Sequence, residues 1–184
     1  MKTTMAILLL WVLVRGATFA DITLRYRAAV VEVIDGNTIV VSNRLLREDV
    51  RLTGLATVKL DAVAAPRTDQ PGGQEAKSFL EKAVIDKEVV VVERSEMGKS
   101  VGAWVFVGEE KKSLNLMMIE QGQAWLVEPR VILSVEMTRR TYDRMKDAFQ
   151  EAKEFRRGIW AAENTVPPWK WQNSEGTNRN ESLK

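Results

Sequence analysis

The side chains of this chain that could take part in chemistry are carboxylates and cations, because the sequence contains neither histidine nor cysteine. That composition excludes imidazole and thiolate as catalysts or metal ligands, so Asp, Glu, Lys, Arg and Tyr are the only candidates for proton transfer. Two sets of residues draw attention. One is the run Asp35-Gly36-Asn37-Thr38, and the other consists of the cations Arg51, Lys59, Arg67 and Lys99.

The cations Lys59, Arg67 and Lys99 could hold a phosphate electrostatically, or they could be scattered surface charges. None of them supplies a deprotonated base near neutral pH. Asp35 alone cannot hold Ca²⁺ usefully, because calcium takes about 6–8 oxygen ligands. Asp61 is a candidate for a relocated acid, since alternation from Leu60 predicts that its side chain points outward.

The first twenty residues have the layout of a secretory signal peptide. Lys2 gives a positive start, residues 5–14 are an apolar run, and small residues precede Asp21. We therefore expect a signal peptide at 1–20, a folded domain at 21–172 and a disordered polar tail at 173–184. The expected location is secreted or periplasmic, without a membrane span after cleavage, because the apolar run is shorter than the roughly 20 residues needed to cross a bilayer.

Net charge gives no support for binding to a polyanion. The chain has 27 basic and 25 acidic residues, and Lys2 and Arg15 lie in the predicted signal peptide, which leaves 25 of each. Any site for nucleic acid must then be a local patch. Without cysteine, no disulfide can hold the exported fold together.

The hydrophobic pattern predicts an α+β domain around a small barrel. Asp35-Gly36-Asn37 separates two β-branched runs, which indicates a hairpin whose turn places Gly36 or Asn37 at a positive φ. Further strands are expected at 50–53, 58–61, 89–92 and 101–107. Helices are expected from Glu75 onward, at 114–119 before Gly122, and at 138–157 before Gly158.

Five stretches carry a resemblance to a known family. They are 31–38 with its DGNT turn, Ala65-Pro66 through Gln70-Pro71 to Gly73-Gln74-Glu75-Ala76, Gly98-Lys99-Ser100-Val101, Asn115-Leu116 through Trp125, and 148–160. In this order they resemble the staphylococcal nuclease (thermonuclease-like) family, and Pro167 to Trp171 is similar to a tail common in its exported bacterial members. The resemblance implies an OB-fold-type five-stranded β-barrel with three helices. It also implies a nuclease that cleaves phosphodiester bonds in DNA and RNA with one bound Ca²⁺.

The resemblance places the family's site residues on positions that have lost their chemistry. The two metal acids fall on Asn37 and on Ala64, the glutamate that acts on water falls on Arg67, and only the first acid of the turn survives, as Asp35. The two phosphate-clamping arginines become Lys59 and Lys99. In another alignment the metal acid falls on Ala56, the glutamate on Lys59 and the first arginine on Arg51. We prefer the first alignment, because it matches the spacing downstream without a gap.

Three hypotheses follow. The leading one is an exported, catalytically inactive domain that needs no cofactor and binds a single-stranded nucleic acid or a protein. The second is a Ca²⁺-dependent nuclease with a rebuilt active site. The third is a structural or interaction domain of the cell envelope. The tryptophans Trp104, Trp125 and Trp160 are expected to be core anchors, and Trp169 and Trp171 to pack on the barrel or to mark a partner surface.

Overall fold

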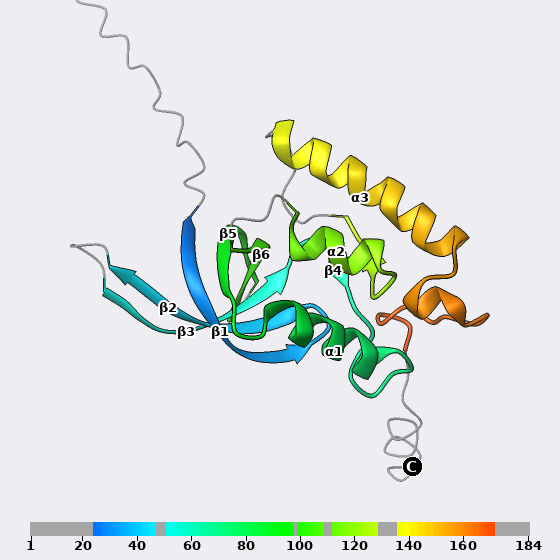
Figure 1. The fold of residues 1–184 in the computed structure, drawn as a ribbon, viewed down its shortest axis with the longest axis horizontal. Coiled ribbons are helices and arrows are strands. Elements are labelled where there is room, and N and C mark those ends of the chain that lie inside the picture. Colours follow the sequence, from blue (N-terminus) through cyan, green and yellow to red (C-terminus); the bar gives the residue numbers. More distant parts are fainter. Residues whose placement is uncertain (1–23, 47–50, 98, 109–111, 129–135, 172–184) are drawn as a thin grey trace, which may run out of the picture.

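The computed structural model describes residues 24–46, 51–97, 99–108, 112–128 and 136–171 (Figure 1). The strands are β1 (Arg25–Asp35), β2 (Thr38–Leu46), β3 (Arg51–Leu60), β4 (Val63–Ala64), β5 (Glu88–Met97), β6 (Ser100–Val107) and β7 (Trp125–Leu126). The helices are α1 (Gly73–Val84), α2 (Leu114–Glu120) and α3 (Glu136–Glu154), followed by a 3₁₀ helix, η1 (Gly158–Ala161). The predicted signal peptide and polar tail lie outside the described residues.

Five strands close into a barrel in the order β1-β2-β3-β6-β5. All neighbouring pairs are antiparallel except β3 and β6, which run parallel with Lys59 opposite Gly102. Alternate residues of these strands point inward and form the core, including Val33, Ile39, Val41, Val58, Leu60, Val89, Val91, Ala103 and Val105. The predicted five-stranded barrel with three helices is therefore confirmed.

The helices cover one end and one side of the barrel (Figure 1). Ala76, Leu80 and Val84 form the buried stripe of α1, at the spacing that its sequence predicts. Met145 and Ala152 are fully buried on α3, but Phe155 lies beyond the end of that helix and is 63% exposed. Among the described residues, no helix is long and apolar enough to cross a bilayer.

Asn115 joins α2 to the barrel through three hydrogen bonds. Its side chain is completely buried. The amide nitrogen donates to the carbonyl oxygens of Asp61 at 2.9 Å and Ala103 at 3.0 Å, and the amide oxygen accepts from the N–H of Val105 at 3.0 Å. The amide thus bonds backbone groups of β6 and of the segment that follows β3, and it supplies a partner for the Asp61 carbonyl and the Val105 N–H.

Replacing Asn115 by leucine should lower the free energy of unfolding by about 2 kcal/mol or more. The leucine fills a similar volume but removes the side-chain partner of the Asp61 carbonyl and of the Val105 N–H, and each buried group left without a partner costs about 1–3 kcal/mol; the Ala103 carbonyl keeps its bond from the Asp61 N–H. Urea unfolding of Asn115→Leu measures the loss. Gln121→Ala, which removes an exposed amide beside α2, is the matched control and should change stability by less than about 0.5 kcal/mol. Equal stability of the two variants would contradict the assignment.

Candidate functional site

The β1–β2 turn packs tightly against the segment that follows β3. A Cβ atom on Gly36 would lie 2.7 Å from the Cβ atoms of Ala65 and Ala76, so only glycine fits there. Neither Gly36 nor Asn37 has a positive φ, so the prediction of one at this turn was wrong. Glycine is needed here because the turn approaches β4 and α1 closely.

Asn37 ties this turn to two neighbouring segments. Its backbone oxygen accepts from the N–H of Leu60 at 2.8 Å, and its side-chain nitrogen Nδ2 donates to the carbonyl oxygen of Val63 at 2.8 Å. Its backbone N–H donates to Oδ1 of Asp35 at 2.9 Å. The surviving acid of the turn therefore accepts a hydrogen bond inside the turn itself, as an Asx turn does.

The geometry favours the alignment that places Ala64 at the metal-acid position. Asn37 contacts Val63, the residue before Ala64, whereas Ala56 pairs with Val41 in the middle of β2. The two positions that the resemblance assigns to metal acids, Asn37 and Ala64, thus lie on adjoining segments. Asn37 carries an amide that donates a hydrogen bond, and Ala64 carries a methyl group.

These residues do not fit a calcium ion. A cation needs oxygen lone pairs, but the nitrogen end of the Asn37 amide faces the carbonyl of Val63 and presents hydrogen atoms there. In the described part of the chain, no group of three or more acidic residues is placed to hold a metal. The site therefore lacks the ligands for the ion that the family resemblance implies.

Asp61 does not replace the missing acids. The prediction that its side chain points outward was wrong, since Asp61 is only 5% exposed and its Oδ1 accepts from the N–H of Ala62 at 3.0 Å. The alternation of β3 ends at Leu60, and Ala62 takes a positive φ of 61°, so the pattern cannot be extended to Asp61. The carboxylate of Asp61 therefore accepts a hydrogen bond within the junction between β3 and β4.

Two of the four candidate cations are on β3, and the other two are in loops. Lys59 is half-buried on β3, and Lys99 is exposed in the turn just before β6. Since Lys59 pairs with Gly102, the Lys99 backbone lies three residues back along the neighbouring strand, or about 10 Å. Arg51 begins β3 at its far end. Lys59 therefore lies on β3 and Lys99 in the turn that leads into the adjoining strand β6, while Arg51 is at the other end of β3.

Arg67 is exposed in the loop between β4 and α1. Its Nε atom lies 3.6 Å from Oδ1 of Asp69, an exposed ion pair of small energetic weight. Its backbone N–H donates to Oε1 of the buried Gln70, which fixes the loop. The position to which the resemblance assigns the base therefore carries a cation that can reach solvent.

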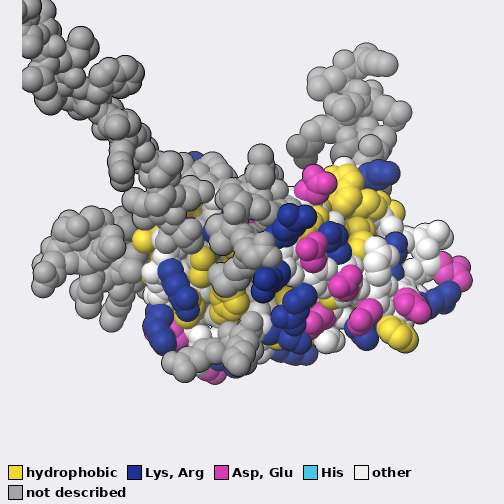
Figure 2. Space-filling model, turned by 90° about the horizontal axis from the view of Figure 1, so that it is seen from above, with side chains coloured by type: hydrophobic (Ala, Val, Ile, Leu, Met, Phe, Trp, Pro, Cys, Tyr) yellow, Lys and Arg dark blue, Asp and Glu magenta, His cyan; other side chains and the backbone are white. Residues whose placement is uncertain are grey.

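The face of the molecule that carries α3 shows Lys and Arg side chains interspersed with Asp and Glu (Figure 2). Lys146 and Asp143 on α3 form one such pair, with 2.6 Å between Nζ and Oδ1. Mixed charges of this kind create no strong field of one sign. The helical face is therefore a weaker candidate for phosphate binding than the barrel positions that carry Lys59 and Lys99.

Aromatic side chains join the C-terminal segment to β7. Trp125 is buried and meets Trp160 and Trp169 edge to face, with ring centroids 5.3 and 6.4 Å apart. Trp104 is also buried, as expected for a core anchor, whereas Trp160 is only partly buried and Trp169 is 59% exposed. The pairing of Ala64 with Trp125 across β4 and β7 was not predicted, because each strand has only two residues.

Replacing Asn37 by aspartate should destabilise the domain by about 1–2 kcal/mol at pH 7, because a carboxylate cannot donate to the Val63 carbonyl. Below the pKa of the new carboxyl group, its O–H restores a donor. The folded state thus raises that pKa, and the loss should shrink as the pH falls toward 4. Urea unfolding at both pH values, each relative to the unsubstituted chain, tests this. Asn164→Asp, on the exposed tail, is the control; a loss of equal size at both pH values would contradict the donor role.

Comparison with known proteins relates the chain to one family of nucleases. The sequence model described as "Staphylococcal nuclease homologue" matches residues 50–162. The protein ParB of Escherichia coli is 30% identical over 84% of each chain. A micrococcal nuclease of Shigella flexneri is 27% identical over 80% of each chain. An uncharacterized endonuclease of Escherichia coli O157:H7 is 28% identical over 78% of this chain and 82% of its own.

Proposed function

Since this chain belongs to the staphylococcal nuclease family, we propose that it is a catalytically inactive member that acts outside the cytoplasm as a binding module. The observation that carries the proposal is the hydrogen bond from Asn37 to Val63, which stands where the family resemblance places a metal acid. Ala64 and Arg67, at the positions of the second metal acid and the base, support the same conclusion. Export rests on the signal-like layout of residues 1–20.

The ligand that we propose for this module is a single-stranded oligonucleotide. The nuclease names of several relatives support nucleic acid as the ligand class. Lys59 on β3 and Lys99 in the turn before the adjoining strand β6 supply the cations. Phosphate contacts of this kind give affinity that depends little on sequence and strongly on salt.

A second candidate is a nuclease with a rebuilt active site, which the names of the relatives favour. It requires a base and a set of metal ligands at new positions. Asp69 is ion-paired with Arg67, Asp61 is buried in the β3–β4 junction, and Glu75 lies in the first turn of α1. These acids do not form a metal-binding group in the described part of the chain, so we favour the inactive module.

The loss of the calcium site predicts that 10 mM CaCl₂ leaves the thermal midpoint of the chain unchanged to within about 1 °C. The variant Asn37→Asp/Ala64→Asp/Arg67→Glu returns the three acidic residues. If this variant binds Ca²⁺ with a dissociation constant of about 1 mM, 10 mM Ca²⁺ would stabilise it by about 1.4 kcal/mol and raise its thermal midpoint by about 3–5 °C. Differential scanning calorimetry with CaCl₂, or with NaCl at equal ionic strength as the control, measures both proteins.

A cleavage assay on single-stranded DNA separates the two candidate functions. We expect no calcium-stimulated cleavage by the pure chain. Cleavage that requires calcium and is lost in Asp35→Ala would overturn the inactive module and support the rebuilt nuclease. A calcium-dependent rise in the midpoint of the unsubstituted chain would likewise show that it retains a metal site.

Binding to single-stranded DNA should depend on Lys59 and Lys99. Fluorescence anisotropy with a labelled oligonucleotide should show affinity that falls with salt, and Lys59→Gln or Lys99→Gln should each reduce the log–log salt slope by about 0.7. The control is Lys146→Gln, whose lysine is exposed on α3 and paired with Asp143. No binding even at about 20 mM salt, where phosphate contacts are strongest, would favour the structural or interaction domain instead.

A further inference from the structure

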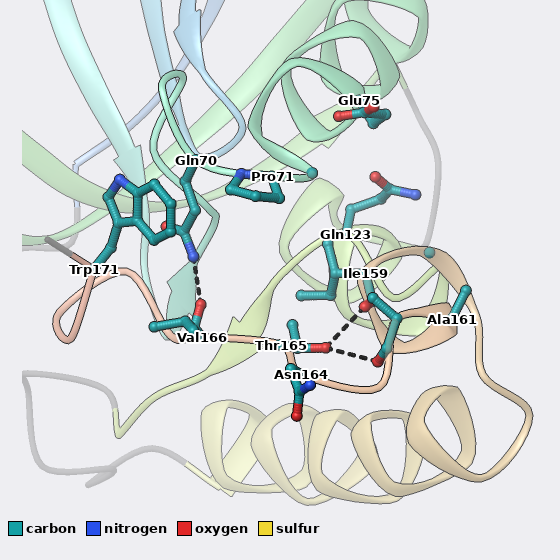
Figure 3. A pocket seen from close by; sticks show the side chains of 13 residues that line it. Gln70, Pro71, Glu75, Gln123, Ile159, Ala161, Asn164, Thr165, Val166 and Trp171 are labelled. Carbon is teal, nitrogen blue, oxygen red and sulfur yellow. Dashed lines mark hydrogen bonds between the residues drawn. The ribbon is translucent and has the colours of Figure 1, made fainter. Parts of the chain in front are cut away.

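A cavity of about 410 Å³ lies between the start of α1 and the C-terminal segment (Figure 3). We call it the tail cavity. Its walls come from the loop before α1, the turn before β7, η1 and the segment that ends at Trp171. Gln70 joins two of these walls, because its side-chain nitrogen donates to the carbonyl oxygen of Val166 and its oxygen accepts from the N–H of Arg67. The cavity is therefore built from segments that are held together.

One acceptor in the wall of this cavity lacks a donor. The Oε1 atom of Gln123 is buried and has no hydrogen-bond partner within the part of the chain that the structure describes. The Nε2 atom of the same amide donates to the carbonyl oxygen of Gln121 at 3.3 Å, which sets the orientation of the amide. The nearby hydroxyl of Thr165 cannot supply the donor, because it is directed to the carbonyl oxygens of Ile159 and Ala162. A buried acceptor of this kind is costly unless a ligand satisfies it.

The charge of the cavity favours a donor with a positive charge. Of the described residues that line the cavity, Glu75 is the only charged one, and none is a cation. In Figure 3 the amide of Gln123 points to the side of the cavity on which Glu75 lies. The remaining walls are largely apolar and include Pro71 and Ile159. Two acceptors at one side and apolar walls around them match an ammonium group on an aliphatic stem.

We propose that the tail cavity binds the primary ammonium group of an aliphatic amine, either the lysine side chain of a peptide or a free alkylamine. The ammonium group donates to Oε1 of Gln123 and to the carboxylate of Glu75, and the stem contacts Ile159 and Pro71. This site goes beyond the proposed function, because it shares no lining residue with the cations of the barrel and attracts ligands of the opposite charge. Loss of amine binding and loss of oligonucleotide binding are therefore detected in separate experiments.

The test is NMR titration of the ¹⁵N-labelled full chain with Nα-acetyl-lysine methylamide. We expect saturable shifts of the Gln123 side-chain amide and of the Trp171 indole signal. Nα-acetyl-norleucine methylamide has a similar stem without the ammonium group and should bind at least about tenfold more weakly, since one charge-assisted hydrogen bond contributes about 1.5 kcal/mol or more. Equal binding of the two probes, or no saturable shift, would overturn the proposal.

A third probe, n-butylamine, separates the two sources of the ammonium group. Affinity equal to that of the lysine probe would identify the amine itself as the ligand. Clearly weaker binding of butylamine would identify a peptide lysine, whose backbone then contributes contacts. Each result is compatible with the proposed ammonium site and selects one of its two sources.

Two variants test the roles of the wall residues. Glu75→Gln should weaken the lysine probe about tenfold, and Glu163→Gln, which removes an exposed acid outside the lining, should not change it. Gln123→Met should weaken the probe without lowering the thermal midpoint, because it removes an acceptor that has no partner in the free protein. A large fall in the midpoint would show that this amide holds the fold instead, and would overturn its assignment as a ligand-binding group.

Discussion

The junction between the β1–β2 turn and the ends of β3 and β4 depends on one residue, Asn37. Its backbone oxygen binds the N–H of Leu60, and its side chain binds the carbonyl oxygen of Val63. Gly36 lets the turn approach Ala65 and Ala76 closely enough for these bonds to form. An aspartate at this position would oppose a carbonyl oxygen with a carboxylate, and a cation would be needed between them. The amide supplies its own donor, so the chain closes this junction without an ion.

An amide and a methyl group at the positions that the resemblance assigns to metal acids would change how the neighbouring cations act. In a metal-dependent site, carboxylates and the bound ion largely neutralise one another, and the surrounding arginines act on the substrate phosphate. Here the acid positions hold an amide and a methyl group, and Arg67 adds a positive charge where the resemblance places a base. Lys59 is half-buried, so salt screens its field less than that of an exposed lysine.

The periodicity of the sequence predicted most strands and helices, because most of them contain runs with one buried face. The two strands expected at 50–53 and 58–61 are one strand, β3 (Arg51–Leu60). The five-stranded barrel was predicted from the order of several motifs that together resemble the family, because no single motif is specific enough. The outward side chain expected for Asp61 and the helix expected to continue to residue 157 were wrong for a common reason: each pattern was extended past the residue where its element ends. The hydrogen bond from Asn37 to Val63, the β4–β7 pairing and the tail cavity depend on contacts between distant segments that leave no periodic signal. The signal that could have indicated the first of these is the asparagine of the DGNT turn.

Asn37 and Ala64 are physically consistent with each other. Ala64 pairs directly with Trp125 across β4 and β7, and residues opposite each other in an antiparallel ladder project to the same face. Trp125 is buried and meets Trp160 and Trp169, so the side chain at position 64 lies beside an apolar cluster. A carboxylate there would lose solvent on one side and would need a cation on the other. Once Asn37 has removed the need for that cation, a small apolar residue at position 64 avoids an uncompensated charge, and alanine meets that requirement.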